Sequence, residues 1–128
     1  MVLYRPVGKK EYDLIKQTGF TKFPPRLSWQ PIFYPVLNQE YAEKIAGEWN
    51  TEDEASDYIG IVTQFSVRDD YIQNFEKHIV GSSLCEEFWI PSEDLEEFNN
   101  NIEGEINIVK VFYGAKYNAE KIFFSTKE

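Results

Sequence analysis

A segment near the middle of the chain, in which apolar side chains alternate with other residues, predicts a β-strand and therefore a sheet. Apolar or small residues occupy every second position between Tyr58 and Val67, namely Ile59, Ile61, Thr63, Phe65 and Val67. A period of two places these side chains on one face of an extended strand. The fold must therefore contain a β-sheet, and this segment is its clearest expected strand.

Two helices are expected before that strand. The first opens at Gly8 and Lys9 and stops at Gly19, and its apolar stripe consists of Tyr12, Leu14 and Ile15. The second begins at Asn38, a good N-cap, and its apolar residues recur at spacings of three and four: Tyr41, Ala42, Ile45, Ala46 and Trp49. This second pattern is the strongest helical signal in the chain.

Shorter elements complete the expected α+β fold. Further strands are expected at Val2–Tyr4 (ending at Arg5-Pro6), 20–23, Ile32–Tyr34, Lys77–Val80, Glu87–Ile90 and Ile106–Phe112, with short helical turns after Asp69 or Asp70 and after Ser92. Because helices come early and strands late, we expect a compact mixed fold with mainly antiparallel sheets and two to four short helices. The last stretch, Ala115–Glu128, is expected to add a strand or to dock as a tail.

Length and charge narrow the class of protein. The 128 residues fit a single domain, 1–128. With 22 acidic and 13 basic residues the net charge is −9, which repels phosphate backbones and anionic lipid surfaces, so neither nucleic acid nor a membrane is an expected partner. Cys85 is alone and the N-terminus lacks the apolar stretch of a signal peptide, which favours a cytoplasmic protein. The oligomeric state stays open.

Metal binding and triad chemistry are not expected. His78 and Cys85 are the one histidine and the one cysteine, so no His/Cys ligand set can be assembled. A catalytic triad would have to use His78, and its neighbourhood does not resemble a nucleophile elbow. We expect His78 to be a structural or surface residue.

Charge is unevenly distributed along the chain. Residues 1–30 contain six basic and two acidic residues, whereas residues 86–105 contain eight acidic residues and no basic one. A basic quarter in an acidic protein can offer a local anion site. A solvated, mixed surface is the simpler explanation of the same pattern.

Two short segments carry residues suited to chemistry. Arg5, in Tyr4-Arg5-Pro6, has a permanent charge and five donors that suit phosphate. Glu87 opens the apolar segment EFWIP, where a carboxylate beside aromatic rings is partly desolvated and can stabilise a developing cation. Each residue also has a plainer explanation, a surface salt bridge for Arg5 and an exposed edge position for Glu87.

The order of these motifs resembles a known family. The segments are LYRPVG, FPPR, QPIFYPVLN, EYA, EFWIP, and EEFN followed by I-x-G, and together they cover about Leu3 to Tyr113. They resemble small bacterial proteins described as "ADP-ribosylation/crystallin J1", and the arrangement is similar to the ADP-ribosyltransferase fold. The resemblance implies an NAD-binding domain that transfers or hydrolyses ADP-ribose.

The resemblance also implies roles for particular residues. Arg5 corresponds to the first-strand residue that binds NAD, and Arg26 is expected to help it hold the pyrophosphate. Phe33 and Tyr34 take the place of the nicotinamide-pocket residue, with Tyr34 as the better stacking partner. Glu87 corresponds to the catalytic glutamate, which stabilises an oxocarbenium-like transition state. No metal is implied.

Two departures from the family pattern bear on the activity, since the middle motif also lacks the usual Ser-Thr-Ser character. Cys85 stands two residues before Glu87, where many such enzymes have Glu or Gln, and a thiol cannot replace a carboxylate in orienting an arginine acceptor. Hydrolysis needs no protein acceptor and is unaffected. The alternative is a catalytically silent protein-interaction module, with the aromatic and proline-rich segment Trp29–Pro35 as its contact loop.

Overall fold

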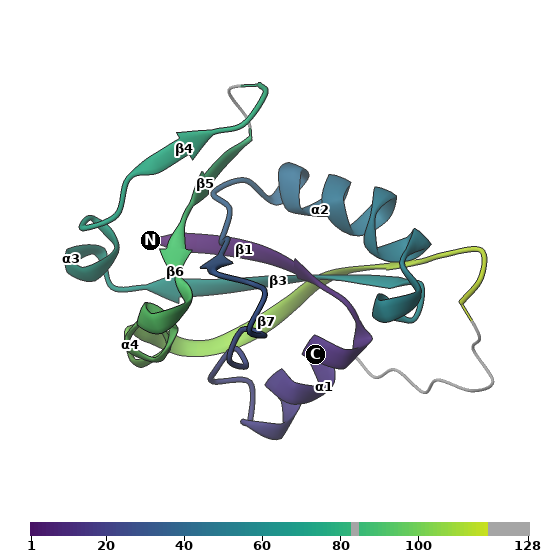
Figure 1. Ribbon diagram of the computed structural model, residues 1–128, viewed down its shortest axis with the longest axis horizontal. Helices are drawn as coiled ribbons and strands as arrows, with labels where there is room; N and C mark the ends of the chain where they lie inside the picture. The colour runs from purple at the N-terminus through teal and green to yellow at the C-terminus, as the bar shows by residue number, and fades with distance from the viewer. Residues whose placement is uncertain (83–84, 118–128) are drawn as a thin grey trace.

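The computed structural model describes residues 1–82 and 85–117, and a three-stranded antiparallel sheet lies at its centre. The sheet has the order β1 (Val2–Val7), β3 (Ile59–Val67) and β7 (Ile102–Tyr113), so the alternating segment found in the sequence is its middle strand (Figure 1). Both neighbours of β3 run antiparallel to it.

Helices cover both faces of this sheet. On one face α2 (Gln39–Glu48) packs through Ala42 and Ala46 against Val62 of β3. On the other face α1 (Lys9–Gln17), α3 (Asp69–Ile72) and α4 (Leu95–Asn100) contribute to the larger core. Figure 1 shows α1 and α2 on opposite sides of the strands. Burial on both faces explains why Gly60 and Val62 are as buried as the alternating set.

Two short ribbons extend the sheet on the β1 side. β4 (Lys77–Ile79) pairs with β5 (Glu86–Phe88), and β2 (Ile32–Phe33) pairs with β6 (Ile90–Pro91). Val36 forms antiparallel bridges with both Tyr4 and Glu87, so it links β1 to β5. The remaining helical turns are 3-10 helices, η1 (Asn50–Glu52), η2 (Glu54–Ser56) and η3 (Ser92–Asp94).

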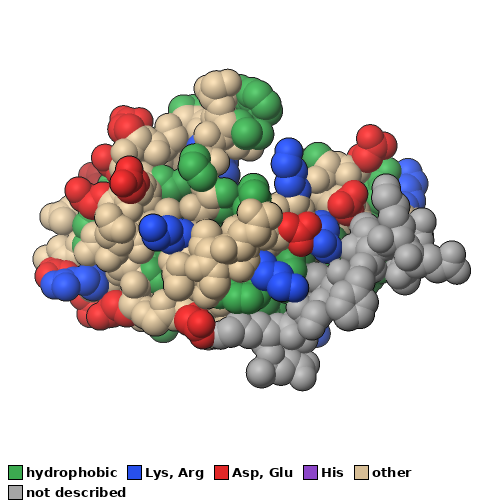
Figure 2. All heavy atoms as spheres, turned by 90° about the horizontal axis from the view of Figure 1, so that it is seen from below, with side chains coloured by type: hydrophobic (Ala, Val, Ile, Leu, Met, Phe, Trp, Pro, Cys, Tyr) green, Lys and Arg blue, Asp and Glu red, His purple; other side chains and the backbone are tan. Residues whose placement is uncertain are grey.

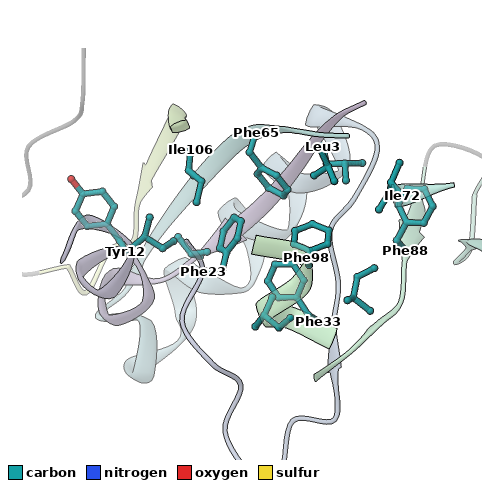
Figure 3. Packing of buried hydrophobic residues seen from close by; sticks show 14 of the residues in the cluster. Leu3, Tyr12, Phe23, Phe33, Phe65, Ile72, Phe88, Phe98 and Ile106 are labelled. Atoms are coloured by element: carbon teal, nitrogen blue, oxygen red, sulfur yellow. The ribbon is translucent and has the colours of Figure 1, made fainter. Parts of the chain in front are cut away.

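Four phenylalanines form the centre of the larger core (Figure 3). The ring of Phe23 lies 5.1 Å from that of Phe33 and 4.8 Å from that of Phe65, and the ring of Phe98 lies 5.3 Å from Phe33. Tilted and edge-to-face contacts at these distances add to the stabilisation from burial. The high aromatic share of the sequence therefore largely serves packing.

The sequence predicted the main elements. The middle strand, the helix capped by Asn38 and the helix between Gly8 and Gly19 are confirmed, as is a mixed fold with antiparallel sheets. Asn38 Oδ1 accepts from the Tyr41 amide, and Gly19 has φ +73° just beyond the end of α1. Lys77–Val80 and Ile32–Tyr34 also contain strands, each one residue shorter than expected.

Several boundaries were wrong. β1 continues through Pro6 to Val7. Tyr4 exchanges backbone hydrogen bonds with Val36, so the backbone N–H of Tyr4 points away from β3. The backbone nitrogen of Pro6, two residues later, points to the same side, beyond the bridge to Val36. Its missing N–H therefore removes no hydrogen bond between strands. The expected strand Glu87–Ile90 is divided between β5 and β6 by Trp89.

Other expectations failed for local reasons. Residues 20–23 form no strand, since Phe20 has φ +62° and the Phe23 backbone instead bonds to the Asn99 side chain. Leu14 and Trp49 were expected inside apolar stripes but are 37% and 73% exposed. Of the expected tail Ala115–Glu128, residues 118–128 lie outside the described residues, and Tyr117 packs against the larger core.

The described surface carries both signs of charge. On the face shown in Figure 2, Lys and Arg side chains lie among Asp and Glu side chains. Within residues 1–82 and 85–117, no helix is long and apolar enough to cross a membrane.

The close approach of α2 to β3 can be tested at one glycine. A Cβ added at Gly60 would lie 2.2 Å from the Ala46 carbonyl oxygen, so Gly60→Ala must push the helix away from the strand. We expect a loss of about 2–3 kcal/mol in the free energy of unfolding, measured by urea denaturation.

Gly47→Ala is the matched control. A Cβ at Gly47 meets the Phe112 ring at 3.5 Å, an ordinary contact, and alanine favours the interior of α2. This variant should be as stable as the wild type or more so. Equal destabilisation of both variants would contradict the close packing at Gly60.

Candidate functional site

Residues from β1, α2 and β5 line one pocket of about 1100 Å³. Its floor includes Arg5 of β1 and Glu87 of β5. Val36 bridges Tyr4 and Glu87, so the Glu87 side chain lies on the α2 face of the strands, whereas that of Arg5 lies on the face of the larger core, against Phe33. The other lining residues are Pro6, Tyr34, Val36, Ile45, Glu48, Trp49, Asn50, Glu52, Asp53, Val80 and Trp89. Three residues singled out from the sequence, Arg5, Tyr34 and Glu87, therefore border the same space.

Glu87 is buried and held by two donors. Its side chain is 9% exposed; Oε2 accepts from the Tyr41 hydroxyl at 3.1 Å, and Oε1 accepts from the Trp89 indole at 2.8 Å. Both oxygens are thus fixed in orientation, and the two donors offset part of the cost of burying the carboxylate. The edge position considered from the sequence does not describe this residue.

Tyr41 is suited to remain a donor. Burial, followed by the neighbouring charge of Glu87, raises the pKa of Tyr41 to about 12. The phenol therefore stays protonated across the physiological range and keeps its hydrogen bond to Glu87.

Trp89 contacts the rings of His78 and Tyr34. The His78 ring stacks on it at 3.7 Å and 6°, and the Tyr34 ring meets it edge-on at 6.4 Å. His78 is the β4 partner of Glu87, so the side chains of both residues and of Trp89 project from the same face of the ribbon. His78 thus holds the indole that donates to Glu87, which agrees with a structural role.

Arg5 is already engaged in an ion pair. Its side chain is buried, and Nε and Nη2 donate to the two carboxylate oxygens of Glu11 at 2.7 and 2.9 Å. The guanidinium also lies 4.6 Å from the centre of the Phe33 ring. Within the described residues Nη1 makes no hydrogen bond, so it is the part of the group left for another acceptor.

The other two residues predicted from the sequence to bind NAD, Phe33 and Arg26, do not line the pocket. Phe33, expected to contact the cofactor, is fully buried in the core and does not line the pocket. Arg26 does not line it either; its Nε donates to the Ile32 carbonyl at 3.2 Å and its guanidinium lies 6.0 Å from the Phe33 ring. Burial, followed by the positive charge of Arg5, lowers the pKa of Arg26. Phe33 therefore contacts the Arg5 guanidinium from the core side, and Arg26 lies over the same ring and repels Arg5.

Sequence reasoning missed several residues of the pocket. Trp89 could have been found, because it stands two residues after Glu87 in an extended segment and so shares its face. Trp49, which lines the pocket, and Tyr41, which donates to Glu87, were both assigned to the apolar stripe of α2, because helical spacing alone does not separate a core ring from one near the pocket. Glu48 and Glu52 carried no signal beyond their charge.

In residues 1–82 and 85–117 no group of three or more His, Cys, Asp or Glu side chains could hold a metal ion. Comparisons of the chain with protein-family models, with curated proteins and with solved structures find no match.

The hydrogen bond between Tyr41 and Glu87 should appear in alkaline unfolding. The pKa values of Tyr41 and of the buried Tyr71 are both raised from 10.0 to about 12. A raised pKa in the folded state contributes stability that is complete below pH 10 and is lost as the pH rises from about 10 to about 12. In Tyr41→Phe this alkaline loss should be smaller, as measured by urea denaturation across that range.

The same substitution separates the loss of the hydrogen bond at neutral pH from the ionisation of the phenol at alkaline pH. At pH 7, Tyr41→Phe should cost about 1.5 kcal/mol, because Glu87 loses a donor while it stays buried. Tyr71→Phe should also reduce the alkaline loss, without that cost to Glu87. If the stability of Tyr41→Phe falls in parallel with the wild type from pH 10 to 12, the Tyr41 assignment is wrong.

Proposed function

We propose that the protein binds NAD in this pocket and cleaves the bond between nicotinamide and ribose, transferring or hydrolysing the ADP-ribosyl group. The proposal depends on one observation: Arg5, Tyr34 and Glu87, which are a cationic, an aromatic and an anionic residue, all line a common pocket of about 1100 Å³. That volume is slightly above the range of about 300–1,000 Å³ that is usual for ligand pockets, and it leaves room for a dinucleotide.

The charges of NAD correspond to the two sides of the floor. Its phosphates are anionic and suit Arg5, while its nicotinamide ring is cationic and suits the side of Glu87 and the aromatic rings. Tyr34 is 40% exposed, and its ring is the expected stacking partner. The expected similarity of the motif order to the ADP-ribosyltransferase fold leads to the same orientation.

In this proposal Glu87 stabilises the positive charge that develops on the ribose. As the glycosidic bond breaks, nicotinamide leaves with the bonding electron pair and becomes neutral, and water or an acceptor adds to the sugar carbon. Tyr41 and Trp89 hold the carboxylate before the reaction begins. A prearranged charge of this kind needs little reorganisation in the transition state.

Glu11 competes with the ligand for Arg5. Its carboxylate occupies Nε and one Nη2 position, so a phosphate meets only Nη1 unless Glu11 moves. Affinity for NAD should therefore be limited by the Arg5–Glu11 pair and should rise when Glu11 loses its charge.

A catalytically silent interaction module on the same fold is the second candidate. Arg5 and Glu87 are both bonded within the protein, Arg5 to Glu11 and Glu87 to Tyr41 and Trp89. Buried polar groups satisfied in this way also occur in sites that are purely structural.

Calorimetric titration with NAD separates the two candidates. We expect saturable binding to the wild type and binding within about threefold in Glu87→Gln, but at least a hundredfold slower release of nicotinamide from that variant. Glu11→Gln should bind NAD about fivefold more tightly, because one competing ion pair of about 1 kcal/mol is removed.

Glu93→Gln, on the exposed surface, is the control and should behave as the wild type. Thermal melting of each variant checks folding, since Arg5 and Glu87 are buried. Absence of wild-type binding at millimolar NAD would exclude the nucleotide proposal and leave the interaction module.

A further inference from the structure

The pocket has an exposed aromatic border above its floor. Trp49 is 73% exposed, Trp89 43% and Tyr34 40%, and all three line the pocket. Large exposed aromatic side chains around one pocket are typical of interaction sites. In the described part of the chain no Lys or Arg cation lies over these three rings; the cation–ring contacts involve Phe33, Tyr58 and Phe112.

The same border is acidic. Glu48, Glu52 and Asp53 line the pocket and are exposed, whereas the one basic lining residue, Arg5, is buried and paired with Glu11. Asp53 is used locally, because its side chain accepts from the Ala55 amide and the Ser56 hydroxyl. Glu48 and Glu52 form no ion pair or side-chain hydrogen bond with any described residue.

The end of α2 adds to this negative potential. The C-terminal end of a helix carries a partial negative charge, which basic residues in the last turn usually offset. The last turn of α2 has no basic residue and ends in Glu48. The arrangement is unfavourable for the isolated chain and attracts an incoming cation.

We propose that this rim, formed by Tyr34, Glu48, Trp49, Glu52, Asp53 and Trp89, binds an arginine-containing peptide segment of a partner protein. A guanidinium can stack flat on an exposed indole while its fork of donors pairs with a carboxylate. A pocket of about 1100 Å³ accommodates several side chains of such a segment. The proposal does not depend on NAD cleavage, since it uses the rim and leaves Arg5 and Glu87 aside.

The test is a titration at low ionic strength with a short peptide that carries four arginines in a Gly/Ser background. We expect Glu48→Gln/Glu52→Gln to bind about tenfold more weakly than the wild type, because two unpaired carboxylates are lost from the contact. Trp49→Ala should bind about fivefold more weakly, through loss of the stacking surface. Added salt should weaken wild-type binding.

The matched control removes the same charge elsewhere. Glu93 and Glu96 are exposed and line a different pocket, so Glu93→Gln/Glu96→Gln should bind the peptide within twofold of the wild type. Equal weakening in the two double variants would mean that the net charge of −9 alone attracts the peptide, and would overturn the proposal.

Further outcomes would also overturn it. These are absence of binding at millimolar peptide, equal binding of a peptide with four glutamates, and equal binding of arginine amide, which would indicate a site for a small cation. The same double variant distinguishes the peptide proposal from the NAD proposal. Glu48→Gln/Glu52→Gln removes negative charge near the phosphates of NAD, so it should strengthen NAD binding about twofold while it weakens peptide binding.

Discussion

The backbone of one short segment, Pro35 to Leu37, joins the two halves of the molecule. Val36 exchanges hydrogen bonds of 2.8 Å with Tyr4, while Pro35 and Leu37 bond to Phe88 and Glu86 at 2.9 and 3.1 Å. The segment behaves as a strand between β1 and β5, although only isolated bridges define it. Without these bonds the strand that carries Arg5 and the strand that carries Glu87 would share no edge, and the pocket would lose its floor.

On that floor, two opposite charges are buried without neutralising one another. The guanidinium is matched by Glu11 of α1, and the carboxylate by neutral donors from α2 and from Trp89, which follows β5. Burial of a charge is tolerated when geometry and partners are good, but it seldom adds net stability. The arrangement therefore holds two oriented charges at the edge of one space, which is the requirement shared by the nucleotide proposal and by any ligand with separated charges.

Much of this could be predicted from the sequence where the local pattern was sufficient. The period of two in β3 and the capped repeat of α2 identified both elements, because burial there follows one face of a regular element. The continuation of β1 through Pro6 could not be predicted, since it depends on which edge Val36 occupies. Phe33 and Tyr34 are adjacent, yet one lies in the core and the other at the pocket, and only the packing of β2 on β6 decides which.

The charged residues of the site could be predicted from the sequence, but the residues that contact them could not. Arg5 and Glu87 were found because a permanent cation and a carboxylate among aromatic residues are unusual in an apolar segment. Glu11, Tyr41 and Trp49 belong to helices, and their relation to the pocket depends on how α1 and α2 pack against the sheet. Helical spacing placed Trp49 in the core, whereas α2 ends before its side chain can reach the interior.

The stack of His78 on Trp89 has a mechanical consequence for the pocket. It fastens the indole to β4, while Glu87 is fixed to β5, so the ribbon carries the carboxylate and one of its donors as a single body. The indole and the carboxylate therefore keep their relative positions, and the hydrogen bonds of Phe88 and Glu86 with Pro35 and Leu37 attach both groups to the rest of the sheet.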